Sequence, residues 1–218
     1  MKFQGHDLSA LDKLDLDGRL KWAAERFPGR VGIGTSLQRG GTILIDACVR
    51  LKLNSIRIYT IDSGRLLPET YEFIETVESH YGIEIEKHRP DPAEVRKMVG
   101  QHGLFLFFDS KEKQELCCFV RKVQPHDLVL EKLDVWITGL RRAQSQNRNE
   151  TMPCEIVQRG GRDILKLNPL YDWSDLMIQD YINQHNVPVH PLYAQGYESM
   201  GCTICTTPIR PGEDKRAG

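Results

Sequence analysis

The sequence lacks the features that mark membrane, secreted and nucleic-acid-binding proteins. No apolar run approaches the length of about 18 residues that spans a bilayer, and the N-terminal segment MKFQGHDLSALDKLDLDGRL has no apolar stretch typical of a signal peptide. The 29 basic and 30 acidic residues give a formal net charge of -1, which excludes a large field of one sign. We therefore expect a cytoplasmic protein that binds neither membranes nor nucleic acid.

The sequence also lacks internal repeats, low-complexity tracts and a disulfide framework. Six cysteines in 218 residues without an export signal favour metal binding or redox chemistry for any that cluster. Two stand alone: Cys48 lies in the apolar stretch ILIDACVRL and Cys154 follows Met152-Pro153, and both are expected to be structural. The other four form two groups, Cys117-Cys118 and Cys202-x-x-Cys205.

Short apolar stretches and amphipathic stretches alternate along most of the chain. Strands are predicted over residues 30–35, 55–61, 83–87 and 135–138, and helices over 42–53, 68–81, 91–103, 111–132 (interrupted at Pro125) and 173–184. Residues 155–158 and 163–167 are predicted to pair as a hairpin. The alternation predicts an α/β fold with a mostly parallel sheet and helices on both faces. We expect one domain over residues 1–207, and a polar segment over 208–218 that begins a longer tail.

Three predicted strands end in groups suited to binding an anion. In such sheets the ligand lies beyond the carboxyl ends of the strands, where the strand order reverses. The first strand runs into GTSLQRGGT, in which Thr35, Ser36, Gly40 and Gly41 lie before a helix whose N-terminus attracts negative charge. No Gly-Lys-Ser/Thr follows, so this is not a Walker A loop. An ordinary tight turn is the alternative.

The second and third strand ends carry acids, hydroxyls and arginines. Each cluster has a simpler alternative, a helix entry with a surface arginine or a solvated basic loop. Planar guanidinium forks suit phosphate or sulfate better than a lysine does. The candidate binding residues are Ile61, Asp62, Ser63, Gly64 and Arg65 at the second strand, and Gly139, Arg141, Arg142 and Arg148 after the last.

The spacing Cys202-Thr203-Ile204-Cys205 suits two thiolates at one metal centre, and it falls in a turn-rich stretch. A thioredoxin-like redox pair is the alternative, but that motif joins a strand to a helix in a small α/β unit. Adjacent Cys117 and Cys118 diverge by about 100° on a helix, which suits binding to different irons of one cluster. With the second pair they could build a cubane cluster or a zinc site; two buried apolar cysteines are the alternative.

These motifs, in this order, resemble the assimilatory adenylylsulfate reductase family, the cluster-bearing relatives of phosphoadenylylsulfate reductases. The resemblance runs from about Val31 to Pro208, through YTIDSGRLLPETYEFIETVESHYGI, CCFVRKVQP, WITGLRRAQSQNR, KLNPLYDW and GYESMGCTICTTPI. It implies a fold like the PP-loop adenine nucleotide alpha-hydrolases. It also implies a 4Fe-4S cluster on Cys117, Cys118, Cys202 and Cys205, with Lys122 between cluster and substrate.

The resemblance implies a reaction as well. A cysteine thiolate attacks the sulfur of adenosine 5'-phosphosulfate (APS) or its 3'-phospho form (PAPS) and releases AMP or its 3'-phosphate (PAP). Thioredoxin, glutaredoxin or a similar thiol then reduces the S-sulfocysteine to free sulfite in assimilatory sulfate reduction. The thiolate must stay deprotonated, and cations must offset the charge of the phosphosulfate. The sequence leaves the oligomeric state open, with an assembly of identical chains as one alternative.

The sequence departs from this family in two places. The family nucleophile lies in a tail beyond the C-x-x-C motif, whereas no cysteine follows Cys205 here, so we expect it beyond Gly218. The first loop carries Arg39 in place of the usual acidic pair, and a basic residue there could accept a 3'-phosphate. Two alternatives stay open: a non-reductase sulfonucleotide-binding iron-sulfur protein or redox sensor, and, less in keeping with the loop, a PP-loop ATP pyrophosphatase.

Overall fold

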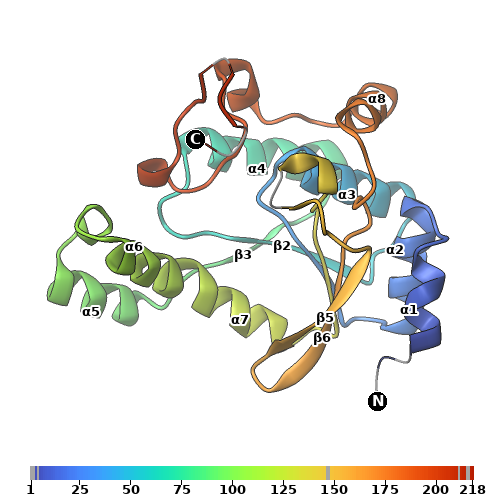
Figure 1. The fold of residues 1–218 in the computed structure, drawn as a ribbon, viewed down its shortest axis with the longest axis horizontal. Helices are drawn as coiled ribbons and strands as arrows, with labels where there is room; N and C mark the ends of the chain where they lie inside the picture. Colours follow the sequence, from blue (N-terminus) through green and yellow to red (C-terminus); the bar gives the residue numbers. More distant parts are fainter. Residues whose placement is uncertain (1–2, 4, 146–147, 211, 215–216) are drawn as a thin grey trace.

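A six-stranded sheet with helices on both faces forms the centre of the computed structural model, which describes residues 3, 5–145, 148–210, 212–214 and 217–218 (Figure 1). The strand order is β3-β2-β1-β4-β6-β5, and only the β5–β6 pair is antiparallel. The strands are β1 (Val31–Gly34), β2 (Ile56–Ile61), β3 (Glu86–His88), β4 (Val135–Ile137), β5 (Cys154–Arg159) and β6 (Arg162–Leu167). The predicted fold class and the predicted hairpin are confirmed.

Helices alternate with the strands as the sequence predicts. The α-helices are α1 (Gly5–Leu11), α2 (Leu16–Arg26), α3 (Arg39–Arg50), α4 (Pro68–Tyr81), α5 (Pro92–His102), α6 (Lys111–Cys118), α7 (Gln124–Leu130) and α8 (Asp175–His185). Short 3-10 turns include η1 (Leu106–Phe108), η3 (Arg142–Gln144), η5 (Pro191–Gln195) and η6 (Thr203–Cys205). Within the described part of the chain, no helix is both long enough and apolar enough to cross a membrane.

Local sequence explains where most helices begin and end. Pro68 starts α4 and Gly82, with a left-handed φ of 65°, ends it, so the predicted bounds 68–81 are confirmed. The Asp91 side chain accepts the backbone N–H of Ala93 at 2.7 Å and caps α5. The largest differences from the predicted bounds are at α3, which covers Arg39–Arg50 rather than residues 42–53, and at β3, which covers Glu86–His88 rather than residues 83–87.

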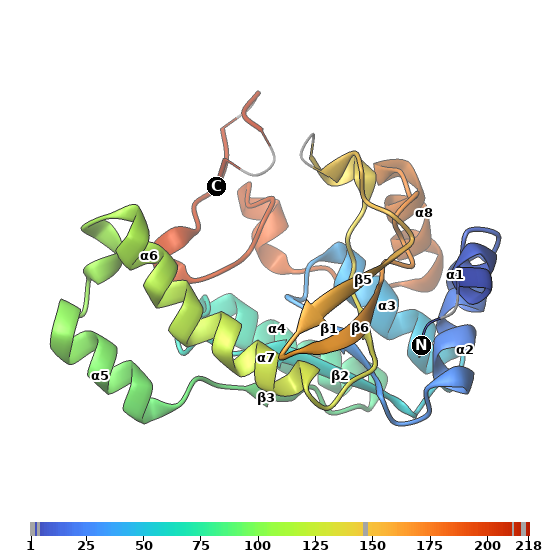
Figure 2. The same ribbon diagram turned by 60° about the horizontal axis from the view of Figure 1, so that its bottom comes forward.

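Apolar side chains bury the two faces of the sheet differently. On one face, alternate residues of β1 and β4 pack against α2, α3 and α8 in the largest core cluster. On the other face, Tyr59 and Ile164 pack with Val129, Leu130 and Leu133 in and after α7. Figure 2 shows α7 crossing the sheet on this side. The second layer is thinner, which leaves room beside it.

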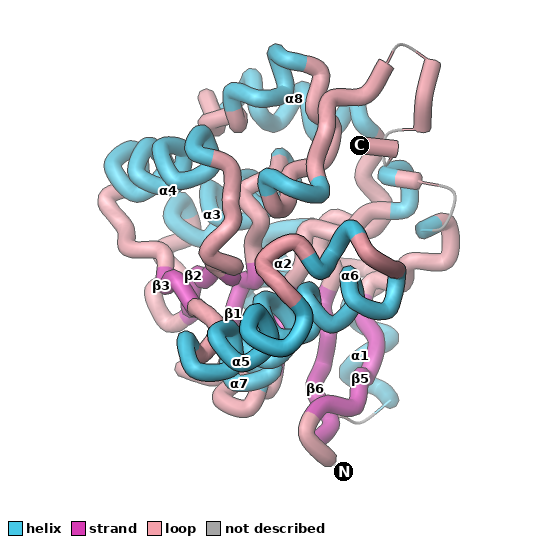
Figure 3. Tube along the Cα trace, turned by 90° about the vertical axis from the view of Figure 1, so that its left-hand side faces the viewer, coloured by secondary structure: helices cyan, strands magenta, loops and turns pink. Residues whose placement is uncertain are grey.

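The predicted long helix over residues 111–132 is broken by a π-helical turn, η2 (Phe119–Val123). Pro125 has no N–H and stands in the first turn of α7, so a regular α-helical hydrogen bond is unavailable there. The backbone N–H of Gln124 instead reaches the carbonyl of Phe119. The turn widens the helix directly after Cys118, and α5 runs beside it (Figures 2 and 3). Such insertions occur frequently at functional sites.

The strand order reverses between β1 and β4. The chain leaves β1 towards β2 on one side, and β4 lies on the other side. A sheet of this kind offers a crevice at the carboxyl ends of these two strands. The sequence after β1 and the sequence after β4 therefore meet at the same edge.

Candidate functional site

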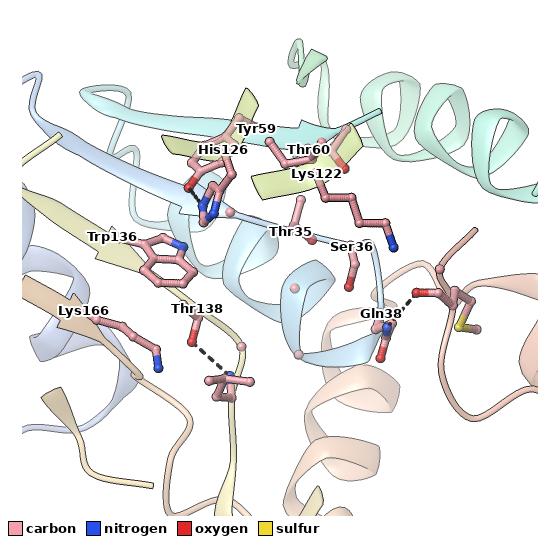
Figure 4. Close-up of a pocket in the computed structure, with 18 of the residues that line it drawn as sticks. Thr35, Ser36, Gln38, Tyr59, Thr60, Lys122, His126, Trp136, Thr138 and Lys166 are labelled. Atoms are coloured by element: carbon pink, nitrogen blue, oxygen red, sulfur yellow. Dashed lines mark hydrogen bonds between the residues drawn. The ribbon is translucent and has the colours of Figure 1, made fainter. Parts of the chain in front are cut away.

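A cavity of about 560 Å³ opens at the reversal point between β1 and β4. Its walls come from the loop after β1, the ends of β2 and β4, the η2–α7 segment, and Met200-Gly201 near the C-x-x-C motif. Figure 4 shows Thr35, Ser36 and Gln38 on one side of it, with Lys122 reaching towards them from η2. Its size suits a nucleotide-sized ligand.

Two glycines bring the walls of this cavity together. A Cβ on Gly40 would lie 2.8 Å from the carbonyl oxygen of Gly139, and a Cβ on Gly139 would lie 2.8 Å from the carbonyl carbon of Gly40. A Cβ on Gly41 would overlap the Thr35 hydroxyl. Backbone meets backbone here, so larger residues would force α3 away from β4.

The loop after β1 directs the N-terminus of α3 into the cavity. The Thr35 hydroxyl accepts the backbone N–H of Leu37 at 2.8 Å, and Leu37 takes a left-handed φ of 58°, which is strained for a branched residue. Gln38 precedes α3 without a side-chain cap, because its amide donates to the carbonyl of Met200 at 3.3 Å. No acidic residue stands in the first turn of α3. A helix N-terminus of this kind attracts an anion.

Aromatic side chains form the inner end of the cavity. Tyr59 Oη and His126 Nε2 lie 3.0 Å apart, and the His126 ring meets the Trp136 ring edge-on at 4.8 Å between centroids (Figure 4). Burial lowers the pKa of His126 to about 4, so the ring is neutral at physiological pH. A Cβ on Gly34 would lie 2.8 Å from Tyr59 Oη and 2.9 Å from Trp136 Nε1. Gly34 therefore keeps this inner end open.

Seven of the predicted binding residues line the cavity. They come from all three predicted strand ends, which the fold brings to one edge. The seven are Thr35, Ser36, Gly40, Gly41, Ile61, Gly139 and Arg148. Lys122, predicted to link cluster and substrate, lines it as well.

The Asp62-Ser63-Gly64-Arg65 turn after β2 faces away from this cavity. Asp62 is buried and accepts from Gly64 N, Tyr71 Oη and Arg89 Nε, and these hydrogen bonds lower its pKa against the opposing effect of burial. Ser63 Oγ lies 3.1 Å from Cys202 Sγ, and the Arg65 guanidinium stacks 4.8 Å from the Phe107 ring centroid. The turn thus shapes the cysteine region rather than the cavity wall.

Arg141 and Arg142 also point elsewhere. Arg141 donates to the Trp173 carbonyl at 2.9 Å and to Asp175 at 2.8 Å, and it lines a recess of about 60 Å³ beside the cavity. Arg142 donates to the Thr151 carbonyl at 2.8 Å and stacks on Tyr171. Arginines chosen from a basic stretch can equally anchor loops, and a linear sequence does not distinguish the two uses. Their predicted contact with the substrate is not seen in the cavity lining.

The four grouped cysteines come together although 83 residues, 119–201, lie between the two pairs. Burial is the largest cause that raises the pKa of Cys118; Lys122 lowers it, and the thiols of Cys117, Cys202 and Cys205 raise it further. All four are free thiols, with Cys117 and Cys202 buried and Cys205 exposed. The two cysteine pairs therefore form one neighbourhood, and we call it the four-cysteine site.

Backbone contacts place the C-x-x-C segment against the turn after β2. Leu66 and Cys202 form an antiparallel bridge, and Thr203 N donates to the Arg65 carbonyl at 2.8 Å. On the other side, the Gln114 amide lies 3.9 Å from Cys205 Sγ. The segment is thus held between the end of β2 and α6.

Lys122 lies between the four-cysteine site and the cavity. It acts on Cys118 electrostatically, and a Cβ on Gly201 would lie 3.8 Å from its Nζ. In Figure 4 its ammonium group reaches towards Ser36. The π-helical turn sets this direction, because Lys122 lies within η2 and Cys118 directly precedes it.

The four-cysteine site combines free thiols with unsatisfied donors. Among the described residues no group of three or more His, Cys, Asp or Glu side chains is arranged to hold one metal ion. Cysteine thiolates are the ligands of iron-sulfur clusters as well as of zinc. Two buried nitrogen atoms, Arg65 Nη1 and Arg121 Nε, have no hydrogen-bond partner in this region. Unsatisfied donors beside free thiols fit an anionic thiolate-bound group.

Comparison with known proteins supports one family. Residues 34–208 match the family model described as phosphoadenosine phosphosulfate reductase domain. The chain is 39% identical over 216 residues to "Adenosine 5'-phosphosulfate reductase" of Agrobacterium fabrum, covering 97% of this chain and 82% of that protein. The chain belongs to the phosphoadenosine phosphosulfate reductase family. The resemblance drawn from the motifs, and with it the prediction of a sulfonucleotide reductase, is confirmed at the level of the family.

Further comparisons agree with this family and its fold. The chain is 44% identical over 184 residues to "Adenosine 5'-phosphosulfate reductase" of Allochromatium vinosum, covering 84% of this chain and 71% of that protein. The crystal structure of phosphoadenylyl-sulfate (PAPS) reductase from Candida auris, a phosphate complex, superposes with a TM-score of 0.78 at 24% identity, covering 94% of this chain and 98% of that one. Yeast FAD synthetase shares the fold at a TM-score of 0.57 and 13% identity, covering 94% of this chain and 70% of that chain.

Sequence reasoning missed several residues of the cavity. Tyr59, Trp136 and Lys166 lie within strands, where side chains on one face were expected to be core. His126 follows Pro125 in a helix and carried no signal of its own. The alternation along β2 and β4 could have placed Tyr59 and Trp136 on one face, but not beside an opening.

Proposed function

We propose that this protein reduces adenosine 5'-phosphosulfate, or its 3'-phospho form, to sulfite and AMP, or PAP, with electrons from a thiol donor. The observation that carries the proposal is the position of Lys122, in the cavity wall and beside the four-cysteine site. A nucleotide in the cavity would lie next to Lys122 and to the four-cysteine site. The family relatives, named adenosine 5'-phosphosulfate reductases, favour the form without the 3'-phosphate.

The cavity offers the contacts that a sulfonucleotide needs. We assign the phosphosulfate to the N-terminus of α3 with Ser36 and Lys122, because both a helix dipole and an ammonium group offset its charge. Arg148, which also lines the cavity, adds a cation. Arg39 faces the adjoining recess, with its guanidinium 3.9 Å from the Tyr193 ring centroid. A 3'-phosphate bound by Arg39 would have to reach that recess.

We assign a 4Fe-4S cluster to Cys117, Cys118, Cys202 and Cys205. When bound, it supplies a compact thiolate-ligated centre of charge beside Lys122. The support is that four free thiols share one neighbourhood, beside two buried arginine nitrogens that have no hydrogen-bond partner among the described residues. Neither of the lone cysteines suits this role: burial raises the pKa of Cys48 to about 12 and that of Cys154 to about 11.

The same two pKa values argue against Cys48 and Cys154 as nucleophiles, because the thiolate is the attacking species. The attacking thiolate is therefore neither of them, and the proposal keeps the expectation that it belongs to a cysteine beyond Gly218. That thiolate bonds to the substrate sulfur, and the sulfur–oxygen bond breaks with AMP as leaving group. One thiol of thioredoxin or glutaredoxin then attacks the cysteine sulfur and sulfite departs with the electron pair, after which the second donor thiol frees the cysteine and leaves the donor as a disulfide. Lys122 offsets the charge of the phosphosulfate during the first step.

The test is an anaerobic assay of the purified full-length protein with APS and a reduced thioredoxin or glutaredoxin. Sulfite and AMP should appear in equal amounts, with one donor disulfide per turnover, and PAPS in a parallel assay defines the preference. Lys122→Met should lose at least about 100-fold in kcat/KM, because it removes a charge that acts in the transition state. Arg96→Met, on the exposed face of α5, is the matched charge control.

Three outcomes separate the alternatives. AMP and sulfite from wild type and from Arg96→Met, but not from Lys122→Met, would support the proposal. Nucleotide binding without sulfite, under any thiol donor, would replace it by a sulfonucleotide-binding protein. Release of AMP and pyrophosphate from ATP would instead indicate an ATP pyrophosphatase.

The remaining expectations belong to the same proposal. We propose a cytoplasmic enzyme whose reductase domain covers residues 1–207, with a polar segment over 208–218 that lies partly outside the described residues. An assembly of identical chains stays a prediction, which a light-scattering mass measurement tests.

A further inference from the structure

We propose that Arg65 is a positioning residue of the four-cysteine site. Arg65 gives the group bound at this site a positive charge and an N–H donor, and it connects the site to residues 103–108. This inference rests on the cluster assignment in the proposed function. It differs from the sequence prediction, which placed Arg65 at the substrate.

The guanidinium of Arg65 has one hydrogen bond and one ring contact within the protein, and one of its nitrogen atoms has no hydrogen-bond partner among the described residues. Its Nη2 donates to the Leu104 carbonyl at 3.0 Å, and its plane stacks 4.8 Å from the Phe107 ring centroid. Nη1 is buried without a hydrogen-bond partner. A guanidinium nitrogen that faces neither water nor an acceptor is costly, so this atom requires an acceptor that the protein itself does not provide.

The neighbours of Arg65 show where that acceptor would lie. Phe107 packs in one apolar cluster with Cys117 and Ile204, and the backbone of Arg65 accepts the N–H of Thr203. Burial lowers the pKa of Arg65 and the nearby Arg121 lowers it further, while Cys117, Cys202 and Cys205 act in the opposite direction. The cation thus lies among the thiols that would carry negative charge.

Two arginines would repel each other here without an anion. Arg121 is buried, donates to the Ser63 carbonyl at 2.9 Å through Nη1, and leaves Nε without a partner. No carboxylate is paired with either arginine in the ion pairs of the described residues. Four thiolates with an iron-sulfur core carry net negative charge, which would satisfy both guanidinium groups.

Arg65 also joins the site to an apolar surface. Leu104 and Phe108 are exposed, while Leu106 and Phe107, which lie between them in the chain, are buried. The hydrogen bond to Leu104 and the stacking on Phe107 hold this segment against the cysteines. A change at Arg65 should therefore loosen the cover of the site as well as its charge.

The experiment compares Arg65→Met and Arg65→Lys with wild type, all reconstituted anaerobically with iron and sulfide. Arg65→Met should bind iron and sulfide but release iron to a chelator about 10-fold faster, the lower end of the usual effect of losing such a supporting contact. Its midpoint potential should fall, because a lost cation no longer stabilises the added electron. Arg65→Lys should have a midpoint potential between those of Arg65→Met and wild type, because lysine keeps the positive charge. It should still lose iron faster than wild type, because lysine lacks the planar set of N–H donors of a guanidinium group.

Control variants separate this role from folding. Arg96→Met removes an equal charge from the exposed side of α5, and should keep the wild-type potential and chelation rate. Phe107→Leu keeps an apolar side chain but loses the stacking and some volume, and should speed iron loss without shifting the potential. If Arg65→Met does not fold, the midpoint potential of Arg65→Lys is compared with that of Arg96→Met. A lower potential in Arg65→Lys supports the inference, and an equal potential in the two variants refutes it.

The results that overturn the inference are distinct from those that overturn the proposed function. Wild-type potential and chelation rate in both Arg65 variants would refute the inference and leave the cluster assignment intact. A wild-type protein that takes up no iron and sulfide would refute the cluster assignment itself. If Arg65→Met is less stable than wild type but keeps the wild-type midpoint potential, Arg65 supports the fold and not the bound group. That result would also overturn the inference on Arg65.

Discussion

The nucleotide cavity and the four-cysteine site are adjacent, yet they are built in different ways. The cavity is formed where backbone packs on backbone, at Gly40 against Gly139, and its threonines are satisfied within the protein: Thr35 accepts from Leu37 N, and the Thr138 hydroxyl lies 2.5 Å from Asn168 Oδ1. The four-cysteine site joins two distant segments and leaves buried arginine nitrogens unpartnered. One buried donor of the cavity wall, Trp136 Nε1, also has no partner among the described residues. The cavity is nevertheless set by backbone packing, whereas the proposed cofactor would complete the four-cysteine site.

Metal binding and folding are coupled when the ligands come from separate segments. The C-x-x-C segment meets the rest of the site through the Leu66–Cys202 bridge and the hydrogen bond from Thr203 N. The cavity depends on the sheet instead, in which β1 and β4 pair over three residues. Loss of the cofactor should thus disturb residues 202–207 and spare the part of the cavity that the sheet and α3 form, while Met200 and Gly201 are the lining residues next to the disturbed segment.

The largest effect is expected for Cys202→Ser. Serine is a poor ligand for iron, so this variant should lose the visible absorption and essentially all bound iron and sulfide. AMP binding, measured by calorimetry, should fall less than 10-fold if the cavity is independent of the cluster.

Cys154→Ser is the matched control, because Cys154 is a half-buried thiol on β5, away from the site. It should keep wild-type iron and wild-type affinity for AMP. Full iron content in Cys202→Ser would contradict the ligand assignment. A complete loss of AMP binding in that variant would contradict the independence of the two regions.

The same contrast explains what the sequence could predict. Spacing found the cysteines, because C-x-x-C and the adjacent pair are local patterns, and alternation found α4, α5 and the β5–β6 hairpin. Arg65, Arg141 and Arg142 were predicted at the substrate because they follow strands. Their stacking and carbonyl contacts are with residues that a local pattern does not reveal, and their contact with the substrate stays a prediction. Tyr59 and Trp136 were missed because an opening beside a strand depends on Gly34 and on how far α7 stands from the sheet.

A smaller but specific effect is expected for Gly139→Ala, which tests the cavity. The added methyl group would meet the backbone of Gly40 and Gly41 at 2.8 to 3.0 Å, and backbone cannot rotate away as a side chain can. The N-terminus of α3 should shift, and affinity for AMP should fall by about 100-fold, or roughly 2.7 kcal/mol.

The control for this variant is Gly100→Ala in α5, where a Cβ would meet nothing within 4 Å. It should bind AMP normally and gain about 0.5–1 kcal/mol in stability, because alanine favours helices. Iron content should stay at the wild-type value in both variants. An unchanged AMP affinity in Gly139→Ala would show that the glycine contact does not set the cavity.

His126 should make the stability of the cavity region depend on pH. Burial lowers its pKa from about 6.5 to about 4, so between these values the unfolded chain binds a proton that the folded protein does not. Stability is therefore complete above about pH 6.5 and falls as the pH drops towards 4. The loss should reach about 1–3 kcal/mol.

Urea unfolding at pH 7.5 and pH 5 measures this contribution. His126→Leu and His126→Gln carry no titrating group, so each should lose less stability than wild type between the two pH values. Other titrating groups are common to all three proteins and cancel in the comparison. An equal loss in wild type and both variants would assign the pH dependence to other residues.

The smallest effect is expected for Thr203→Val, which tests what holds the C-x-x-C segment. The Thr203 hydroxyl donates to the carbonyls of Arg65 and Leu66 at 3.3 and 3.2 Å, near the long limit for such bonds, and it is exposed. The shorter backbone bond from Thr203 N to Arg65 O, at 2.8 Å, is untouched by the substitution. Valine should therefore cost under about 1 kcal/mol in thermal unfolding and change the rate of iron loss to a chelator less than 2-fold. Thr203→Ser keeps the hydroxyl and should match wild type. A 10-fold faster loss in Thr203→Val alone would mean that side-chain contacts, and not the backbone bridge, close the site.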